Sequence, residues 1–256
     1  FVASAILNIA DDHIDWHGSF DEYAKAKISI LDRATTAVLN ADEGEIVKRT
    51  SHWQGKKVFY SLDTPAPGEI GLVEELLVDR AFVQDPQEAS MFAELVEVKP
   101  TIPHNVSNTL AAAALARTVC VSHEDIRSAI KDFRPGRHRI ETVHSADSIN
   151  WVDDSKATNP HAATASLLSH ESVVWIAGGL AKGAAMEELV ERTAKRIKAA
   201  ILIGTDRGLI EAALMKFCPD VPRVLIDGDS SQELMEKVVM AAKGFAKAGD
   251  TVLLAP

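Results

Sequence analysis

The sequence predicts an α/β protein of two domains, the second of them a parallel, doubly wound sheet. Short apolar runs alternate with amphipathic stretches through residues 149–254, which is the pattern of strands that alternate with helices. The chain has 256 residues, enough for two domains of ordinary size, and 46% of them are hydrophobic. Pro135 and Gly136 interrupt the preceding helical pattern, so we expect domains at residues 1–135 and 136–256.

The first domain is predicted to begin with a strand, a polar loop and a helix. Residues 1–8 form an apolar run, residues 10–19 are polar, and residues 20–33 have apolar positions at helical spacing. Ser19, with Glu22 three positions later, has the spacing of a helix N-cap. The other elements that we expect are strands at 36–40, 58–62 and 71–78 and helices at 104–117 and 122–133.

The second domain is predicted to alternate between strand and helix from its first strand to its last. The expected strands are at residues 149–152, 172–176, 200–203, 224–226 and 251–254. The expected helices are at residues 161–168, 186–198, 208–217 and 231–246. Ligands of such sheets bind at the carboxyl ends of the strands, so the loops that follow the strands are the places to look for a site.

Charge and composition exclude several classes of protein. The net charge is -10, the pI is near 5.4, and no cluster of Lys and Arg is present, so we expect no nucleic-acid partner. No apolar run reaches the roughly 20 residues of a membrane helix, and the first residues lack the basic start of a signal peptide, so we expect a soluble protein. Cys120 and Cys218 fit no metal or redox motif, which predicts buried structural thiols in a cytoplasmic protein.

Acidic and imidazole side chains follow the first predicted strand. Asp12, His13 and Asp15 lie in the loop, and Lys27 lies on the next helix. Magnesium prefers oxygen ligands, and an imidazole can complete a site when phosphates supply other oxygens. A magnesium site at His13 is one interpretation of this loop, and a solvated or helix-capping loop is the other.

Three further motifs lie near predicted strand ends or the domain junction. Residues 153–160 place carboxylates, hydroxyls and Lys156 at a helix N-terminus, where anions are favoured, although such a loop can also serve only as a cap. Gly178 and Gly179 precede Lys182 but match neither a Walker A loop nor a dinucleotide fingerprint. At the junction, Arg139 can stack on a base or bind phosphate, and a solvated basic linker is the alternative.

Taken in order, these motifs resemble those of the Mur ligases, the ATP-dependent ligases of peptidoglycan assembly. The resemblance covers nearly the whole chain, and it rests on five strings that occur in the family's order: N-I-x-x-D-H-x-D-x-H-G from Asn8, Y-x-x-A-K ending at Lys27, G-R-H-R-I-E from Gly136, D-S-K-A-T-N-P from Asp154 and G-G-x-x-K-G from Gly178. It implies the later part of a central ATPase domain followed by a Rossmann-like C-terminal domain.

The resemblance also implies roles for individual residues. His13 would be a magnesium ligand, and Lys27 would be carboxylated by carbon dioxide to a carbamate that binds the same ion. Such a carbamate turns a cation into the oxygen anion that magnesium prefers. The residues that would hold ATP are Asn105, Asn108, Arg139 and Asp154. The residues that would bind the incoming amino acid are His138, Lys156, Thr158 and Lys182, the last with a catalytic role.

The D-S-K-A-T-N string is similar to that of the family member that adds D-glutamate to UDP-N-acetylmuramoyl-L-alanine. The implied reaction activates a carboxylate with ATP as an acyl phosphate, which the amine of D-glutamate then attacks. The family's UDP-binding domain, glycine-rich ATP loop and final substrate loop have no counterpart in these residues. We therefore expect an internal fragment, monomeric and inactive by itself.

Other functions stay open at this point. The chain could belong to another Mur-type ligase that uses a different amino acid. The D-S-K-A-T-N string, together with Thr158 and Lys182, is the feature that distinguishes the D-glutamate ligase from such a relative. A metal-dependent hydrolase would use Asp12, His13 and Asp15 to activate water without ATP. A non-catalytic nucleotide-binding module would need none of these residues. Neither of the last two explains the Lys156, Thr158 and Lys182 set of the second domain.

Overall fold

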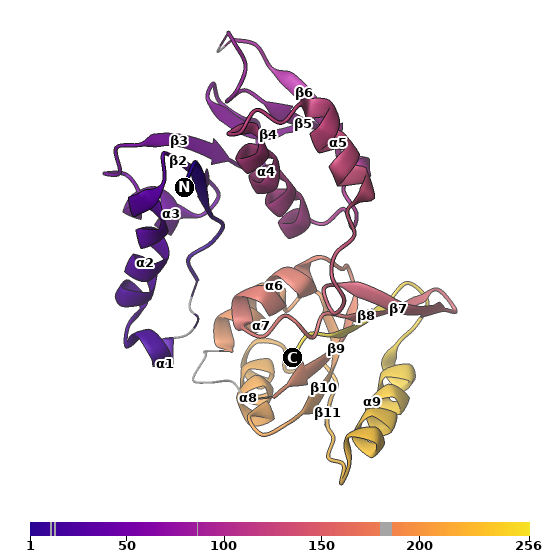
Figure 1. Cartoon of the computed structure of the whole chain (residues 1–256). Coiled ribbons are helices and arrows are strands. Elements are labelled where there is room, and N and C mark those ends of the chain that lie inside the picture. The colour runs from indigo at the N-terminus through magenta and orange to yellow at the C-terminus, as the bar shows by residue number, and fades with distance from the viewer. Residues whose placement is uncertain (11, 13, 86, 180–185) are drawn as a thin grey trace. The chain divides into compact units, whose positions relative to one another are not determined.

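The computed structural model describes residues 1–10, 12, 14–85, 87–179 and 186–256, and the chain divides into two units, Phe1–Arg134 and Pro135–Pro256. Each unit contains one six-stranded sheet with helices packed against it (Figure 1). The predicted α/β class is confirmed.

The sheet of the first unit has the strand order β1-β2-β3-β4-β5-β6. The first four strands are parallel, and the last two run antiparallel to their neighbours. The parallel strands are β1 (Ala3–Ile6), β2 (Thr36–Asn40), β3 (Lys56–Tyr60) and β4 (Glu69–Val73), and the antiparallel ones are β5 (Leu76–Asp79) and β6 (Ser90–Glu94). The carboxyl ends of β1, β2 and β3 therefore meet at one edge of the sheet.

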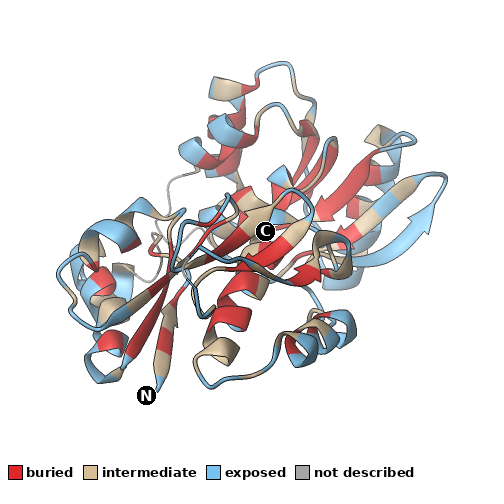
Figure 2. Ribbon diagram, turned by 90° about the horizontal axis from the view of Figure 1, so that it is seen from above, coloured by how far each residue is buried: buried red, intermediate tan, exposed pale blue. Residues whose placement is uncertain are grey.

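Helices cover both faces of this first sheet because alternate strand residues point in opposite directions. Ala37 and Leu39 of β2 pack into a cluster with residues of α2 and α3, whereas Val38 packs with residues of α4 and α5. The buried residues of these strands form the interior in Figure 2. The helices are α1 (Ile14–His17), α2 (Phe20–Ile28), α3 (Gly44–Arg49), α4 (Pro103–Arg117) and α5 (His123–Asp132), with 3₁₀ turns η1 (Ser29–Arg33) and η2 (Leu95–Glu97).

Ionic contacts fasten α5 to the rest of the first unit. Arg127 on α5 donates from Nε to both carboxylate oxygens of Glu97, at 3.0 and 2.8 Å. His123 at the start of the helix lies 2.9 Å from the carboxylate of Asp79, which is fully buried and also accepts from Arg117 at 3.1 Å. The helix is thus tied to β5 and to η2 by charged groups as well as by its buried apolar residues.

The sheet of the second unit has the strand order β11-β10-β9-β12-β8-β7, and all of its neighbouring pairs are parallel except β7 with β8. Its strands are β7 (Glu141–Ala146), β8 (Ile149–Asp153), β9 (Val173–Gly178), β10 (Ile197–Ile203), β11 (Arg223–Leu225) and β12 (Thr251–Leu254). The chain runs from β8 to β9 past the place that β12 later fills. The loops that follow β8 and β9 lie at the carboxyl edge of this sheet, where open α/β sheets bind ligands.

Helices also cover both faces of the second sheet. Trp175 and Ala177 of β9 pack with residues of α6, α7 and α8, while Val174 and Ile176 pack with residues of α9. The helices are α6 (Pro160–Leu168), α7 (Glu187–Thr193), α8 (Arg207–Phe217) and α9 (Ser231–Phe245). The result is a helix–sheet–helix sandwich, as expected for the doubly wound domain.

Several predicted elements were wrong. Residues 71–78 form two strands of a hairpin instead of one strand, because the chain turns at Glu74, which has a φ of 54°. The predicted helix at 186–198 ends at Thr193, since β10 already begins at Ile197. The helices α1 and α3 and the strands β6 and β7 were not predicted. Because β7 runs antiparallel to β8, the second sheet is not wholly parallel.

The two cysteines differ in their surroundings. Cys218 is buried, and burial raises the pKa of its thiol. Cys120 is exposed and follows α4 with a φ of 62°, so the prediction of a buried thiol was wrong for this residue. Within the described part of the chain, no helix has both the length and the apolar character needed to cross a membrane.

Candidate active site

Lys27 lies on α2 and reaches back to the chain that leaves β1. Its ammonium Nζ donates to the backbone oxygen of Asn8 at 3.0 Å and to the Asn8 side-chain oxygen at 3.1 Å. The same nitrogen lies 4.9 Å from the centre of the Tyr23 ring. A half-buried cation thus sits among oxygen atoms and an aromatic face, beside the loop of the predicted magnesium site. His13, the other predicted ligand, lies outside the described residues.

Polar side chains that the sequence analysis missed join the ends of the first three strands. Asn40 donates from Nδ2 to the backbone oxygen of Leu7 at 3.0 Å, which links β2 to the end of β1. The carboxylate of Asp42 accepts from the Ser61 hydroxyl at 2.5 Å and from the Leu62 N–H at 2.9 Å, which links the loops after β2 and β3. One polar residue at the end of each strand was the signal that could have revealed this set.

The two predicted adenine-site residues of α4 lie in different surroundings. Asn105 is buried, and its Nδ2 donates to the backbone oxygen of Pro100 at 2.8 Å, so this amide fastens the loop before the helix. Asn108, one turn further on the same face, is exposed. Of the two amides, that of Asn108 is the one in position to meet a ligand.

In the second unit, a loop before β7 is hydrogen-bonded to the loop after β8. His138 lies 2.7 Å from the Asp153 carboxylate through Nδ1, and its backbone oxygen accepts from the Lys156 N–H at 3.2 Å. The Ile140 N–H donates to the Asp154 carboxylate at 3.2 Å. His138 and Ile140 have φ values of 65° and 47°, a backbone shape that these contacts hold.

Electrostatics keep Asp153 ionised. Burial raises the pKa of the Asp153 carboxyl, but hydrogen bonds from His138 and Ser155 outweigh burial and leave this pKa below its ordinary value. Asp154, the predicted ribose ligand, is more deeply buried, with 8% of its surface exposed. The backbone N–H of Asp154 donates to the backbone oxygen of Leu254 at 2.8 Å, so Asp153 and Asp154 are both anchored at the sheet edge.

The remaining predicted residues of this loop face outward. Lys156, Thr158 and Arg139 are exposed. Asn159 directly after them caps α6, because its Oδ1 accepts from the Ala162 N–H at 2.8 Å. The loop therefore presents a cation and a hydroxyl from a backbone that is fixed at both ends.

The turn after β9 needs glycine. Gly178 has a φ of 129°, and a Cβ atom at this position would lie 1.8 Å from the backbone oxygen of Ile203. The Asp206 N–H donates to the Gly179 oxygen at 3.0 Å, which ties this turn to the loop after β10. Lys182, predicted to act on the substrate from the following residues, lies outside the described part of the chain.

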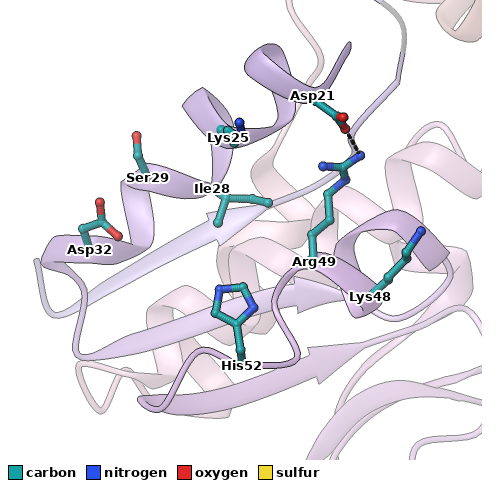
Figure 3. Close-up of a pocket in the computed structure, with 8 residues that line it drawn as sticks. All are labelled: Asp21, Lys25, Ile28, Ser29, Asp32, Lys48, Arg49 and His52. Atoms are coloured by element: carbon teal, nitrogen blue, oxygen red, sulfur yellow. Dashed lines mark hydrogen bonds and ion pairs between the residues drawn. The ribbon is translucent and has the colours of Figure 1, made fainter. Parts of the chain in front are cut away.

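The first unit also has a surface groove of about 550 Å³ between α2 and α3, which contains none of the predicted site residues (Figure 3). Its charged side chains are largely paired with one another. Arg49 donates to Asp21 and to Glu45, each at 2.6 Å, and Lys25 donates to Glu22 at 2.6 Å. These pairs describe a solvated surface with its charges satisfied.

Among the described residues, one group of three side chains comes close enough to share a metal ion. The ligand atoms of His138, Glu141 and Asp153 lie within 4.8 Å of one another. These atoms already serve the loop: Glu141 accepts from the His138 N–H at 2.9 Å and lies 3.7 Å from Arg137 Nε. The group is explained by its own hydrogen bonds and is distinct from the magnesium site that the sequence predicted.

Comparisons with known proteins agree with this architecture. Residues 1–116 match the Mur ligase middle domain, and residues 138–256 match the Mur ligase glutamate ligase domain. A UDP-N-acetylmuramoylalanine--D-glutamate ligase of Thermobifida fusca (strain YX) is 47% identical over 258 residues, which is 99% of this chain and 55% of that protein. One of the same name from Streptomyces coelicolor (strain ATCC BAA-471 / A3(2) / M145) is 47% identical over 260 residues, with the same two shares.

Solved structures show the same fold at much lower identity. MurF from Acinetobacter baumannii matches 98% of this chain with a TM-score of 0.69 and 18% identity, over 56% of its own length. The UDP-N-acetylmuramate-alanine ligase MurC of Thermotoga maritima matches 100% of this chain with a TM-score of 0.67 and 16% identity, over 56% of its own length. The chain thus spans little more than half the length of the proteins that it matches.

Proposed function

The chain belongs to the Mur ligase family, and we propose that it is part of an ATP-dependent ligase that joins D-glutamate to UDP-N-acetylmuramoyl-L-alanine. The observation that carries the proposal is the D-S-K-A-T-N loop after β8. Hydrogen bonds fix the backbone of this loop, and the side chains of Lys156 and Thr158 are exposed. The 47% identity to ligases of that name supports the choice of D-glutamate. The activity is proposed for a longer protein, because the chain covers 55% of those relatives.

We assign residues 1–135 to the later part of a central ATP-binding domain and residues 136–256 to a C-terminal domain that binds the amino acid. The matches to the middle and glutamate ligase domains of the family, which end at 116 and begin at 138, support this division. A ligase with this division works in the cytoplasm, where ATP and UDP-linked precursors are available.

D-glutamate is assigned to the second unit. The two carboxylates of D-glutamate need hydrogen-bond donors and positive charge, and we assign these roles to Thr158, Lys156 and Lys182. The exposure of the first two and the fixed backbone between them support this role. A fixed donor set lowers the entropy lost when a flexible dicarboxylate binds.

ATP-binding roles are assigned to four residues, two in each unit. The exposed amide of Asn108 suits the hydrogen-bonding edge of adenine, and Asn105 positions the start of α4. The exposed Arg139 suits stacking on a base, and Asp154 suits a ribose hydroxyl. When bound, ATP supplies the phosphoryl group that activates the carboxylate of the UDP-linked substrate as an acyl phosphate.

Magnesium does not fit Lys27 in the form that the structure shows. An ammonium that donates to two oxygens of Asn8 would repel the ion. Carboxylation of Nζ to a carbamate would reverse its charge and supply an oxygen ligand, which we propose together with His13 as the second ligand. The half-buried position of Lys27, with Nζ against the oxygens of Asn8 in the loop after β1, supports this role.

The test of the proposed function is an assay of ADP release by the full-length ligase with UDP-N-acetylmuramoyl-L-alanine as the acceptor. The incoming amino acid is varied among D-glutamate, L-lysine and meso-diaminopimelate at equal concentration. We expect ADP release only with D-glutamate, together with an amide product of the matching mass. Release that depends on L-lysine or meso-diaminopimelate would instead assign the chain to another ligase of the family.

A matched pair of variants tests the amino-acid site within the same assay. Thr158→Val removes the hydroxyl and keeps the shape, so the KM for D-glutamate should rise about tenfold, as for one lost hydrogen bond to a charged group. Thr142→Val alters an exposed threonine of β7 and should leave KM unchanged. An unchanged KM in Thr158→Val would remove this residue from the site.

A further inference from the structure

Formation of the amide requires a base that the proposed site residues have not supplied. At neutral pH the amine of an amino acid is an ammonium, which has no lone pair with which to attack a carbonyl. One N–H proton must leave before the carbon–nitrogen bond forms, and a second must leave before the amide is complete. Lys156, two residues before Thr158, is already assigned to a carboxylate of the substrate.

The loop contacts of the second unit orient one imidazole for this task. Nδ1 of His138 lies 2.7 Å from an oxygen of Asp153. A carboxylate can only accept a hydrogen bond, and Asp153 is ionised because its pKa is lowered. Nδ1 therefore carries the proton and donates, which leaves the lone pair of neutral imidazole on Nε2.

The imidazole is also held beside the residues to which D-glutamate is assigned. The backbone oxygen of His138 accepts from the Lys156 N–H at 3.2 Å, two residues before Thr158. The His138 side chain is 51% exposed, whereas that of Asp153 is 19% exposed. A half-open ring with an anchored Nδ1 can meet a substrate with its other nitrogen.

We propose that His138 Nε2 is the general base for the incoming amine and that Asp153 is the positioning residue that sets its tautomer. The proposal rests on the proposed ligase function. His138 Nε2 takes one proton from the ammonium, and the free amine attacks the carbonyl carbon of the acyl phosphate. The tetrahedral intermediate then breaks its carbon–oxygen bond, phosphate leaves with the electron pair, and the nitrogen loses its second proton to phosphate. His138 finally releases its proton to water.

The test compares two nucleophiles on the full-length ligase with ATP and UDP-N-acetylmuramoyl-L-alanine. D-glutamate needs a base, whereas hydroxylamine is largely unprotonated near neutral pH and attacks acyl phosphates directly to give a hydroxamate. For His138→Ala we expect D-glutamate ligation to fall at least about 100-fold, the usual loss of a general base, while hydroxamate formation stays within about threefold. Parallel losses with both nucleophiles, or no loss with either, would overturn the proposal.

Variants of Asp153 separate positioning from general damage. Asp153→Asn keeps an oxygen that accepts from Nδ1, so ligation should fall about tenfold or less, and Asp153→Ala should lose more. Both should keep hydroxamate formation. Equal ligation rates in Asp153→Ala and wild type would remove Asp153 from the proposal.

A control variant and the wild-type protein complete the design. His144→Ala changes an exposed histidine of β7 and should leave both reactions unchanged, so a loss in this variant would overturn the assignment to His138. If the wild-type enzyme formed the hydroxamate but no product with D-glutamate, the proposed amino acid would be wrong. The role of His138 would then be tested with the amino acid that the enzyme does accept.

Discussion

Lys27 and His138 both lie near the carboxyl ends of parallel strands, but the chain holds them in different ways. Lys27 is held by oxygens of one residue, Asn8, and by the face of Tyr23. His138 belongs to a loop that is tied to the loop after β8 through the His138 side chain, the His138 backbone oxygen and the Ile140 N–H. The second arrangement is ready for its proposed chemistry, whereas Lys27 would become the proposed metal ligand only after its charge is reversed.

This difference separates two ways in which a protein prepares a site. A neutral imidazole acts as a base once its tautomer is fixed, and hydrogen bonds within the fold can do that. A metal ligand must be an electron-pair donor, and no hydrogen bond turns an ammonium into one. We therefore expect the second unit to lose its proposed role in ligation when its backbone contacts are broken. The first unit should lose its role when the Lys27 nitrogen is removed.

Lys27→Ala should give the largest effect. Loss of the proposed carbamate removes a metal ligand, and we expect the ligation rate to fall on the order of a thousandfold, or ~4 kcal/mol in transition-state free energy. Acetate or propionate in solution should restore part of the rate by supplying the missing oxygens. The measurement is ADP release with and without these salts.

Lys25→Ala is the matched control for this experiment. Lys25 lies on the same helix, is exposed and pairs with Glu22, so its removal should leave the rate unchanged. Full activity in Lys27→Ala would remove Lys27 from the mechanism, and His138 would then have no counterpart in the first unit.

Gly178→Ala should give the next largest effect, on the backbone of the second unit. A Cβ atom 1.8 Å from the Ile203 oxygen forces β9 and β10 apart at the edge where the loops attach. We expect the free energy of unfolding to fall by about 2–4 kcal/mol, within the range for severe steric changes. Urea unfolding followed by the fluorescence of the buried Trp175 measures it.

Gly208→Ala in α8 is the control for the steric effect. A Cβ there meets nothing within 4 Å, so this variant should be as stable as wild type or more stable by up to about 1 kcal/mol. Equal unfolding midpoints for the two alanine variants would show that the turn after β9 tolerates a side chain and that this edge is less rigid than we infer.

Sequence patterns revealed the fold where periodicity was strong and failed where it was weak. The second unit alternates apolar strands with helices, so its parallel strands were predictable. β7 was missed because nearly all of its residues are exposed, and α3 because its six residues are too few to show a period. The hairpin of β4 and β5 was read as one strand because its turn uses Glu74 and Glu75 in place of Gly or Asn.

The sequence supplied candidate residues for the site but not the contacts between them. Strand-end positions pointed to Asp154, Lys156 and Thr158, and their roles stay predictions. The pairing of His138 with Asp153 and that of Asp42 with Ser61 were not predicted, because each joins loops separated in sequence by 15 and 19 residues. Such pairs depend on tertiary structure, which a single sequence pattern does not record.

Asp42→Ala tests whether the edge of the first unit is held by side chains. Its carboxylate accepts from the Ser61 hydroxyl and from the Leu62 N–H, so its loss leaves two donors to water. We expect a destabilisation of about 1–2 kcal/mol, as for one or two hydrogen bonds to a charged group. Hydrogen exchange at Leu62 should become faster by a corresponding factor.

Asp63→Ala is the control, because this exposed neighbour contributes its backbone N–H, which donates to Ser61 and remains after the substitution. Exchange at Leu62 should then match wild type. Equal rates in both variants would mean that the backbone alone holds this edge.

The smallest effect is expected at the ion pair that fastens α5 to η2. The hydrogen bond from Arg127 lowers the pKa of Glu97 from an ordinary 4.5 to about 2, although burial acts in the opposite direction. Above pH 4.5 the carboxylate is ionised in both states, so its stabilisation is complete there. As the pH falls from about 4.5 to about 2, the unfolded chain binds the proton first and this stabilisation is lost.

We expect this loss to be about 1 kcal/mol, because the neighbouring solvent screens the pair. Hydrogen exchange of the α5 amides between pH 5 and pH 3, corrected for intrinsic rates, measures it, and Glu97→Gln should abolish the pH dependence. Glu124→Gln on the exposed start of the same helix should keep the wild-type slope. If Glu97→Gln also kept that slope, the acid sensitivity of the first unit would lie in other groups, and the edge around Lys27 would be the next place to seek it.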